Sequence, residues 1–197
     1  MPDKLGVEAK YFFNKEKAGA YEHNKSIIKA QIKMAERLSE LIKLGVNQLL
    51  LELGCGTGIA SVHFKEKAGR AVGVDLSIEM LNYANNKNID IVNADFKNIP
   101  FRDRVFNAVT SISSLQWIWG STLEQVISKY TMVIKEIKRV IQKDGVVGVQ
   151  FYPQSMREFD FVTGLFKKNG FEGAIIIDAP DTPRKTKKYL ILSLRSR

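Results

Sequence analysis

The segment 49–58, Leu-Leu-Leu-Glu-Leu-Gly-Cys-Gly-Thr-Gly, constrains the fold of this chain more than any other. It is typical of a buried strand that carries an acidic residue near its end and runs into a glycine-rich turn that opens a helix. Glycines adopt positive φ and carry no Cβ, so a ligand can approach the backbone closely. The start of the helix offers unpaired N–H groups to polar or anionic ligand groups. This layout indicates an adenosine-bearing cofactor that lies across the end of a parallel sheet.

The spacing of the glycines separates two classes of cofactor. A dinucleotide motif, G-x-G-x-x-G, requires its third glycine at position 59, which is Ile59. Here Gly54, Gly56 and Gly58 form G-x-G-x-G, and Glu52 lies two residues before the first glycine. The pattern resembles the glycine motif of the class I S-adenosylmethionine-dependent methyltransferases. A nicotinamide-dependent dehydrogenase is therefore the less favoured reading.

Composition sets the broad class of the protein. A chain of 197 residues suits one domain, 1–197, which we divide into an N-terminal helical cap, 1–45, and a Rossmann-like core, 46–197. No apolar run approaches the ~20 residues that cross a bilayer. The beginning of the chain lacks the apolar region of a secretory signal. One cysteine allows no internal disulfide and supplies no zinc-ligand set. We expect a cytoplasmic protein with no membrane association and no metal site.

The charge of the chain indicates a class of partner. Thirty Lys and Arg residues against 21 Asp and Glu give a net charge of +9. Such a field favours polyanions, of which RNA is abundant in any cytosol. Solubility alone explains the excess equally well. A basic cluster near the C-terminus, Arg184, Lys185, Lys187 and Lys188, is either a phosphate contact or a solvated hairpin.

Alternating helical and strand patterns follow the first motif along the chain. They predict helices at about 24–44, 59–68, 77–86, 122–140 and 155–169, and strands at about 49–53, 70–75, 89–94, 105–112, 146–151, 171–178 and 187–194. The fold class is therefore α/β: a Rossmann-like class I methyltransferase fold with a seven-stranded, mostly parallel sheet and helices on both faces. Because no helix separates the last two strands, we expect one of them to be antiparallel at the end of the sheet. Asp144-Gly145 is expected to turn the chain into the fifth strand.

Three acidic residues fall at strand ends and should converge on one crevice: Glu52, Asp75 and Asp95. Asp75 follows Gly54 by 21 residues, the spacing at which a carboxylate reaches ribose hydroxyls. Asp95 precedes Phe96, so a carboxylate can accept from an adenine amino group while a ring packs on the base. The alternative for Asp95 is a turn cap.

Two further segments leave strands toward the same crevice and bring aromatic residues. Trp117 follows the fourth strand, and Tyr152 follows the fifth. Aromatic faces stack bases, so these two rings could hold a flat methyl acceptor between them. The alternative is packing in the core or in a lid, which is the favoured reading for Trp119.

Beyond the glycine motif, the chain resembles the broad methyltransferase pattern at Val74-Asp75-Leu76-Ser77, Met80-Leu81, Ala94-Asp95 and Phe106-Asn107. Relatives usually carry Phe-Asp at the last pair, so Asn107 is a departure. A more specific set occurs in order along the chain: Tyr21-Glu22-x-Asn24, Ser113-Ser114-Leu115-Gln116-Trp117, Gln150-Phe151-Tyr152-Pro153, Gly170-Phe171-x-Gly173 and Thr186-Lys187-Lys188-Tyr189-Leu190. This set resembles the small-subunit ribosomal RNA guanine-N7 methyltransferases, including shorter archaeal forms.

The resemblance implies a function, a cofactor and partners. The function is methyl transfer from S-adenosylmethionine to guanine N7 in small-subunit ribosomal RNA, with Trp117 and Tyr152 as the catalytic pair that positions the base. The implied donor-binding residues are Tyr21, Glu52, Gly54, Cys55, Gly56, Gly58, Asp75, Leu76, Met80, Asp95, Phe96 and Ser111. The implied partners are RNA of the small ribosomal subunit and a small zinc-binding activator protein. The activator could dock on the edge strand at 89–94.

Two alternatives from other classes remain open at this stage. One is a small-molecule methyltransferase of the ubiquinone or sterol type, which shares the superfamily motifs. The other is a ribosome-assembly factor whose catalysis is dispensable. Guanine N7 has a free lone pair and no proton to lose, so its methylation needs no general base. The chain offers no obvious base, because its two histidines, His23 and His63, fall before and inside predicted helices.

Overall fold

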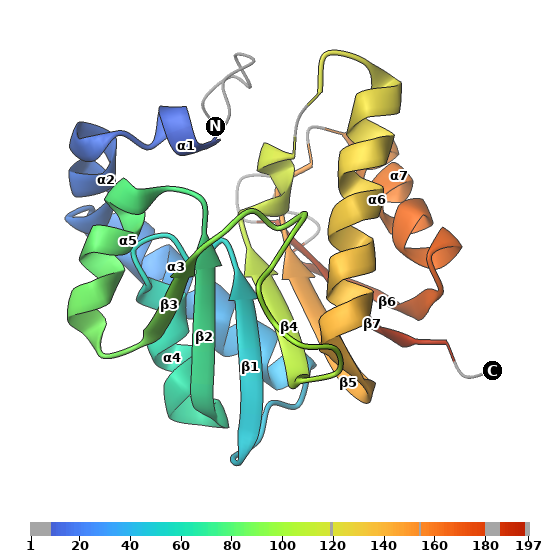
Figure 1. Ribbon diagram of the computed structural model, residues 1–197, viewed down its shortest axis with the longest axis horizontal. Helices are drawn as coiled ribbons and strands as arrows, with labels where there is room; N and C mark the ends of the chain where they lie inside the picture. Colours follow the sequence, from blue (N-terminus) through green and yellow to red (C-terminus); the bar gives the residue numbers. More distant parts are fainter. Residues whose placement is uncertain (1–8, 119, 154, 180–185, 196–197) are drawn as a thin grey trace.

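A computed structural model describes residues 9–118, 120–153, 155–179 and 186–195. Its centre is a seven-stranded sheet in the order β3-β2-β1-β4-β5-β7-β6, with helices on both faces (Figure 1). The strands are β1 (Gln48–Leu53), β2 (Gly69–Asp75), β3 (Asp90–Asn93), β4 (Phe106–Ile112), β5 (Ile141–Gln150), β6 (Phe171–Asp178) and β7 (Lys187–Leu194). The predicted fold class and number of strands are confirmed.

Three helices precede the sheet and the others connect its strands. The helices are α1 (Ala9–Phe12), α2 (Lys15–Glu22), α3 (Lys25–Leu41), α4 (Ile59–Ala68), α5 (Ile78–Ala84), α6 (Leu123–Val140) and α7 (Met156–Lys168), with short 3-10 helices η1 (Asn85–Lys87) and η2 (Leu115–Trp117). Among the residues described, none of these helices combines the length and the apolar character that a membrane span requires.

The central parallel strands of the sheet, such as β1 and β4, are buried on both faces, as parallel strands require. Along β1, Leu50 packs with residues of α3 and α4, whereas Leu51 and Leu53 pack with residues of α6 and α7 on the opposite face. A continuous apolar run therefore forms one strand with two buried faces. This arrangement places the polar glycine turn after Leu53 at the edge of the core.

Side-chain caps fix where several helices begin, as the sequence predicts. The Asn24 side chain accepts from the backbone N–H groups of Ser26 and Ile27. Ser77, Thr122 and Ser155 cap α5, α6 and α7 in the same way. Each cap satisfies N–H groups that would otherwise lack a partner in the first turn. Helix α3 ends at Leu41 rather than at the predicted Gly45, because Ile42 is buried and Lys43 takes a positive φ.

The predicted turn at Asp144-Gly145 is wrong. Strand β5 begins at Ile141, directly after α6, and runs through both residues. Its pairing with β4 shifts between Phe106↔Ile141 and Ala108↔Val146, so the Asp-Gly pair lies in a bulge of the strand. Gly145 is required there because a Cβ would lie 2.9 Å from the Asn107 carbonyl oxygen. The Asp-Gly pair thus marks a bulge within the strand, a place that favours glycine as a turn does.

The antiparallel strand is β7, and it does not lie at the end of the sheet as predicted. It is inserted between β5 and β6 and pairs antiparallel with both. The edge position belongs to β6 instead. At the opposite edge lies β3, where the family resemblance implies it.

The packing of α3 on the sheet predicts a large cost for removing a buried side chain. Leu38 is fully buried against β5, where its Cδ1 would lie 2.9 Å from a Cβ at Gly148. We expect Leu38→Ala to lower the free energy of unfolding by about 2–5 kcal/mol, because the site loses apolar contacts and retains a cavity. Ile32→Ala on the exposed face of α3 is the control and should cost clearly less. Chemical denaturation measures both, and equal costs would contradict the packing.

Candidate functional site

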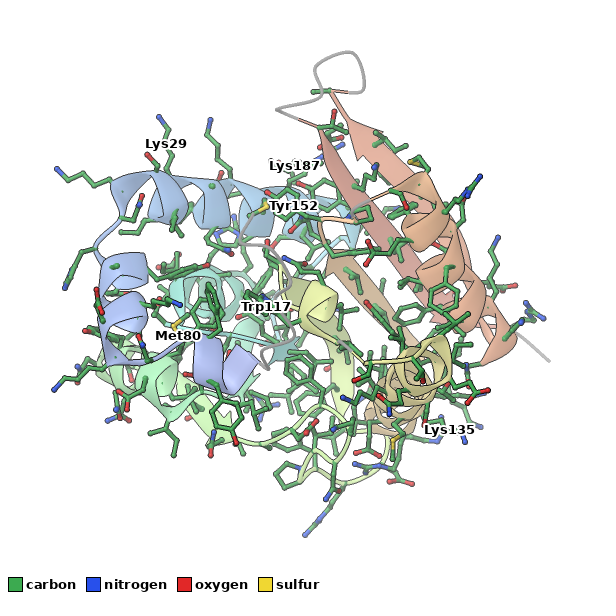
Figure 2. All side chains as sticks on the ribbon, turned by 90° about the horizontal axis from the view of Figure 1, so that it is seen from above. Lys29, Met80, Trp117, Lys135, Tyr152 and Lys187 are labelled. Atoms are coloured by element: carbon green, nitrogen blue, oxygen red, sulfur yellow. The ribbon has the colours of Figure 1, made fainter. Side chains whose placement is uncertain are left out.

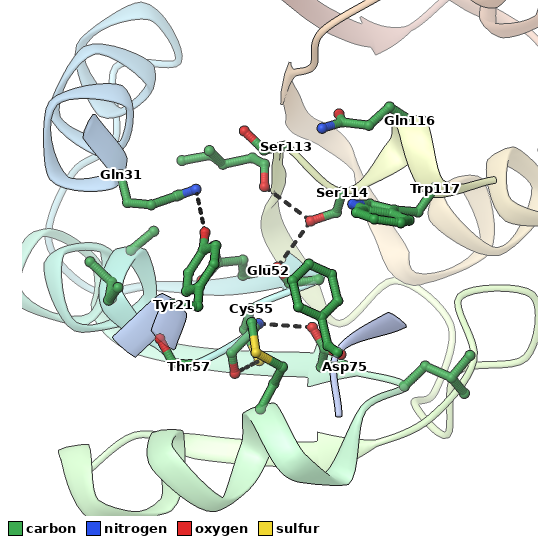
Figure 3. A pocket seen from close by; sticks show the side chains of 18 of the residues that line it. Tyr21, Gln31, Glu52, Cys55, Thr57, Asp75, Ser113, Ser114, Gln116 and Trp117 are labelled. Atoms are coloured by element: carbon green, nitrogen blue, oxygen red, sulfur yellow. Dashed lines mark hydrogen bonds between the residues drawn. The ribbon is translucent and has the colours of Figure 1, made fainter. Parts of the chain in front are cut away.

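A pocket of about 820 Å³ opens beyond the carboxyl ends of β1, β2, β4 and β5, and the segments of α1, α2 and α3 close it from the other side (Figure 3). Twelve of the fourteen predicted site residues line it: Tyr21, Glu52, Gly54, Cys55, Gly56, Asp75, Leu76, Met80, Asp95, Phe96, Trp117 and Tyr152. Ligands bind at this position in open α/β sheets. The residues that the sequence groups by strand ends are therefore brought together in one cavity.

The glycine turn lies at the floor of the pocket in left-handed backbone conformations. Gly54 has φ of +79° and Gly56 of +54°. A Cβ at Gly54 would lie 2.1 Å from the Ser114 hydroxyl oxygen. That hydroxyl donates to the Gly54 carbonyl oxygen at 3.0 Å. The loop after β4 therefore packs directly on the backbone of the turn, and only glycine leaves room for it.

Asp75 binds across the turn from the end of β2. Its Oδ2 accepts from the Gly56 N–H at 2.8 Å, and its Oδ1 accepts from the Ser77 N–H at 2.9 Å. Burial raises the pKa of Asp75, although these backbone N–H groups oppose the shift. The carboxylate thus holds the turn closed and remains on the pocket wall, at the place predicted for a ribose contact.

Glu52 is the most deeply buried acid of the site. Its Oε2 accepts from the Ser61 hydroxyl of α4. Burial raises the pKa of Glu52 to about 8, against the opposing effect of the Ser61 hydrogen bond. Close by in the turn, the buried Thr57 hydroxyl has no hydrogen-bond partner among the described residues. This end of the pocket therefore holds polar groups whose bonding a ligand would complete.

Tyr21 enters the pocket from α2 and is oriented by α3. The Gln31 Nε2 donates to the Tyr21 hydroxyl oxygen at 2.8 Å (Figure 3). Burial raises the pKa of Tyr21 to about 12, so the phenol stays neutral. The bond joins two helices of the N-terminal segment above the glycine turn.

Asp95 and Phe96 lie on the wall beyond β3. Asp95 forms a 3.1 Å ion pair with the Lys97 ammonium and also accepts from the Lys97 backbone N–H at 2.9 Å. The residue therefore caps a turn, as its alternative reading says, and lines the pocket beside Phe96 as well. The turn cap is confirmed, and the contact of Asp95 with adenine stays a prediction.

Trp117 and Tyr152 lie in different surroundings of the same pocket (Figure 2). The Trp117 ring contacts Phe12 and Phe13, with centroid distances of 4.9 and 5.2 Å. The Tyr152 hydroxyl lies 3.5 Å from the Met34 sulfur, and the Lys187 ammonium lies 4.8 Å from the centre of the Tyr152 ring. Each ring thus packs on a neighbouring element and also presents surface to the cavity.

Two predicted donor-binding residues are not among those that line the pocket. Gly58 caps α4, and a Cβ there would lie 2.6 Å from Ile89 Cδ1, so its role is close packing. Ser111 is buried in β4 with an unpartnered hydroxyl, whereas Ser113 and Ser114 reach the pocket. The expectations for Trp119 and for the pair 184–185 lie outside the described residues.

Sequence reasoning missed part of the wall. Phe12, Phe13, Gln31 and Met34 line the pocket from the N-terminal segment, and no motif in the sequence singles them out. Gln116 also lines it and belongs to a segment that carried the family resemblance, so that segment was the available signal. Asn107, the departure from the family pattern, keeps the role of an acceptor because its Oδ1 takes the Leu49 N–H at 2.9 Å.

Comparison with protein families agrees with this geometry. Residues 51–149 match the family model of the methyltransferase domain. The range runs from β1 and the glycine turn to near the end of β5, and it includes the glycine turn and the strand ends that line the pocket. Fold, site and family model together define a class I S-adenosylmethionine-dependent methyltransferase, as predicted.

Relatives across nearly the whole chain narrow this class. The 18S rRNA (guanine-N7)-methyltransferase bud23 of Schizosaccharomyces pombe is 30% identical over 187 residues, which cover 92% of this chain and 70% of that protein. The 18S rRNA (guanine-N7)-methyltransferase of Bos taurus is 28% identical over 188 residues, which cover 92% and 67%. The chain belongs to the family of the 18S rRNA guanine-N7 methyltransferases.

Solved structures show the same fold at lower identity. An S-adenosylmethionine-dependent methyltransferase of Methanococcus maripaludis matches with a TM-score of 0.73 and 17% identity, covering 94% of this chain and 95% of the other. A methyltransferase solved in complex with the Haloferax volcanii Trm112 methyltransferase activator matches with a TM-score of 0.67 and 14% identity, covering 92% and 97%. These likenesses confirm the architecture.

The close approach at Gly54 gives a test of the turn. We expect Gly54→Ala to weaken binding of S-adenosylhomocysteine at least tenfold, because the new Cβ collides with Ser114 and a positive φ costs an alanine about 1–2 kcal/mol. Calorimetric titration measures the affinity. Gly164→Ala in α7 is the matched control, since a Cβ there meets nothing within 4 Å. Unchanged affinity in Gly54→Ala would contradict a role of the glycine turn in binding the ligand.

The raised pKa of Glu52 predicts how stability depends on pH. Folding raises this pKa from 4.5 to about 8, so the folded protein holds a proton that the unfolded chain has lost. The stabilisation is complete below the unfolded value and is lost as pH rises through 8. In the wild type this loss contributes to a decline of the free energy of unfolding between about pH 5 and pH 8. We expect Glu52→Gln to make that decline less steep by on the order of 1 kcal/mol per pH unit.

Denaturation at a series of pH values measures this slope. Glu136→Gln is the control, because Arg139 lowers the pKa of Glu136 and its contribution is lost only in acid. A Glu52→Gln protein that keeps the wild-type slope would show that another group carries the dependence.

Proposed function

We propose that the protein transfers a methyl group from S-adenosylmethionine to N7 of a guanine in small-subunit ribosomal RNA. The observation that carries the proposal is the family relationship over 92% of the chain, combined with a pocket that keeps the motif residues together. Several relatives from fungi, an animal and a social amoeba bear the same 18S rRNA guanine-N7 name. The chain covers about two thirds to 70% of their lengths.

The donor end of the pocket fits the methyl donor. The left-handed turn lines the pocket at Gly54 and Gly56, and the unpartnered Thr57 hydroxyl lies beside it. We assign Asp75 to the ribose hydroxyls and Asp95 with Phe96 to the adenine. Bound there, S-adenosylmethionine supplies a methyl group on a positively charged sulfur. The Asp75 carboxylate, which lines the same pocket, then provides an environment that suits a cation.

The acceptor end requires positioning rather than proton removal. The N7 lone pair forms the new bond to the methyl carbon while the carbon–sulfur bond breaks, and the positive charge passes from sulfur to the guanine ring. No proton leaves N7. We therefore assign Trp117 and Tyr152 to hold the base in line and to exclude water. In the described part of the chain, no histidine lines the pocket, which suits an acceptor that needs no base.

A small-molecule acceptor is the second candidate function. It is favoured by relatives such as the demethylmenaquinone methyltransferase of Corynebacterium kroppenstedtii, which is 29% identical over 96 residues. That match covers 49% of this chain, however, and the ribosomal RNA enzymes match nearly all of it. The similarity to the ribosomal RNA enzymes therefore extends over the segments that we assign to the acceptor.

We further propose that RNA contacts Lys187 and Lys188, which lie near the rings of Tyr152 and Phe159. We also propose that the protein acts in the cytoplasm, where small subunits are available.

A zinc-binding activator is proposed to pair with the edge strand β3. Support comes from the fold shared with a methyltransferase solved with an activator protein. A stable and fully active protein in the absence of such a partner would count against it.

The experiment that tests the function is methyl transfer to purified small ribosomal subunits with labelled donor, followed by mass mapping of the RNA. We expect one guanine to gain an N7 methyl group and quinone precursors to gain none. Trp117→Ala should lower turnover by at least tenfold with little change in donor affinity, because the ring lines the pocket at the end that we assign to the acceptor. Label in a small metabolite and none in RNA would establish the second candidate instead.

A further inference from the structure

The side-chain amide of Gln116 has a fixed orientation. Its Oε1 accepts from the Tyr152 backbone N–H at 3.4 Å. A backbone N–H can only donate, so it must meet the oxygen of the amide and not the nitrogen. Gln116 is 9% exposed and lines the pocket, and its amide extends back over the cavity toward Ser113 (Figure 3). The NH2 group is therefore the part of the amide that remains for a ligand.

The backbone that carries Gln116 is held firmly. Ser113 has a φ of +56°, a strained value for a residue other than glycine. Two bonds to Gln150 keep it there: the Ser113 N–H donates to the Gln150 carbonyl at 2.9 Å, and the Ser113 hydroxyl donates to Gln150 Oε1 at 2.9 Å. The Tyr130 hydroxyl donates to the Leu115 carbonyl at 2.9 Å. These bonds fix η2 against the sheet.

In the described structure no hydrogen-bond acceptor meets the Gln116 NH2 group. Gln116 lines the same pocket as Trp117 and Tyr152, the two aromatic residues assigned to the base. Purines differ at the position beside N7: guanine presents the O6 acceptor, and adenine presents an N6 donor. If the proposed function is correct, N7 must point at the methyl group. The neighbouring O6 or N6 position then faces the wall of the pocket that Gln116 lines. We propose that Gln116 selects guanine over adenine by donating an Nε2–H to O6.

The test replaces single groups on the base and on the protein. The guanine found by mass mapping is replaced in an RNA fragment by inosine, which keeps O6, or by 2-aminopurine, which lacks it. For the wild-type protein we expect kcat/KM with inosine to stay near that of guanine and kcat/KM with 2-aminopurine to fall by about 10- to 100-fold, the discrimination of one good base contact. Gln116→Met should bring the guanine to 2-aminopurine ratio close to one.

Two further variants separate this role from a structural one. Gln116→Glu keeps an acceptor for the Tyr152 N–H but replaces the donor, so it should reject guanine more strongly than Gln116→Met while the Kd of S-adenosylhomocysteine stays unchanged. Gln31→Met is the matched control, because it alters the same pocket through the bond to Tyr21. We expect kcat/KM to fall equally with guanine and with 2-aminopurine, so that the ratio of the two stays at the wild-type value.

The outcomes distinguish the inference from the proposed function. A Gln116→Met or Gln116→Glu protein that binds S-adenosylhomocysteine normally and keeps the wild-type base ratio would overturn the role of Gln116 and leave the RNA acceptor intact. Equal rates on guanine and 2-aminopurine in the wild type would overturn it as well. A wild-type protein that methylates no guanine in any RNA would overturn the proposed function, and this inference with it.

Discussion

The contact between Gly54 and Ser114 is the constraint on which the site depends. The turn after β1 and the loop after β4 come so close that no Cβ fits between them. This approach joins the proposed donor end of the pocket, which begins at the turn, to the proposed acceptor end, which begins at Ser114 and continues to Trp117. Since methyl transfer needs an in-line geometry within a fraction of an ångström, a rigid joint between the two ends is a physical requirement of the chemistry.

Local patterns were sufficient to predict much of the fold. Strand β1, helix α4 and the final strands fall where the apolar runs and the glycine turn place them. Asp144-Gly145 misled because the same dipeptide serves hairpins and bulges, and only the pairing with β4 decides between them. The place of β7 could not be read either, since strand order depends on contacts between distant segments.

The candidate site was predicted best at the ends of strands. Glu52, Asp75 and Asp95 had to meet because parallel strands end at one edge of the sheet. Phe12 and Gln31 come from helices that precede the sheet, and their sequence pattern does not say which way those helices turn over the pocket. The orientation of the Gln116 amide depends on the Tyr152 N–H from the segment after β5, a contact that no local pattern encodes.

The insertion of β7 between β5 and β6 bears on the order of folding. Strand β6 pairs with β7 alone, although it precedes β7 in the chain. Until β7 arrives, β5 has an open edge and β6 has no neighbour to satisfy its backbone. The strands that carry the glycine turn, β1, β2 and β4, pair among themselves earlier in the sequence. A nascent chain could therefore assemble the donor end first, while the sheet closes only with its last strand.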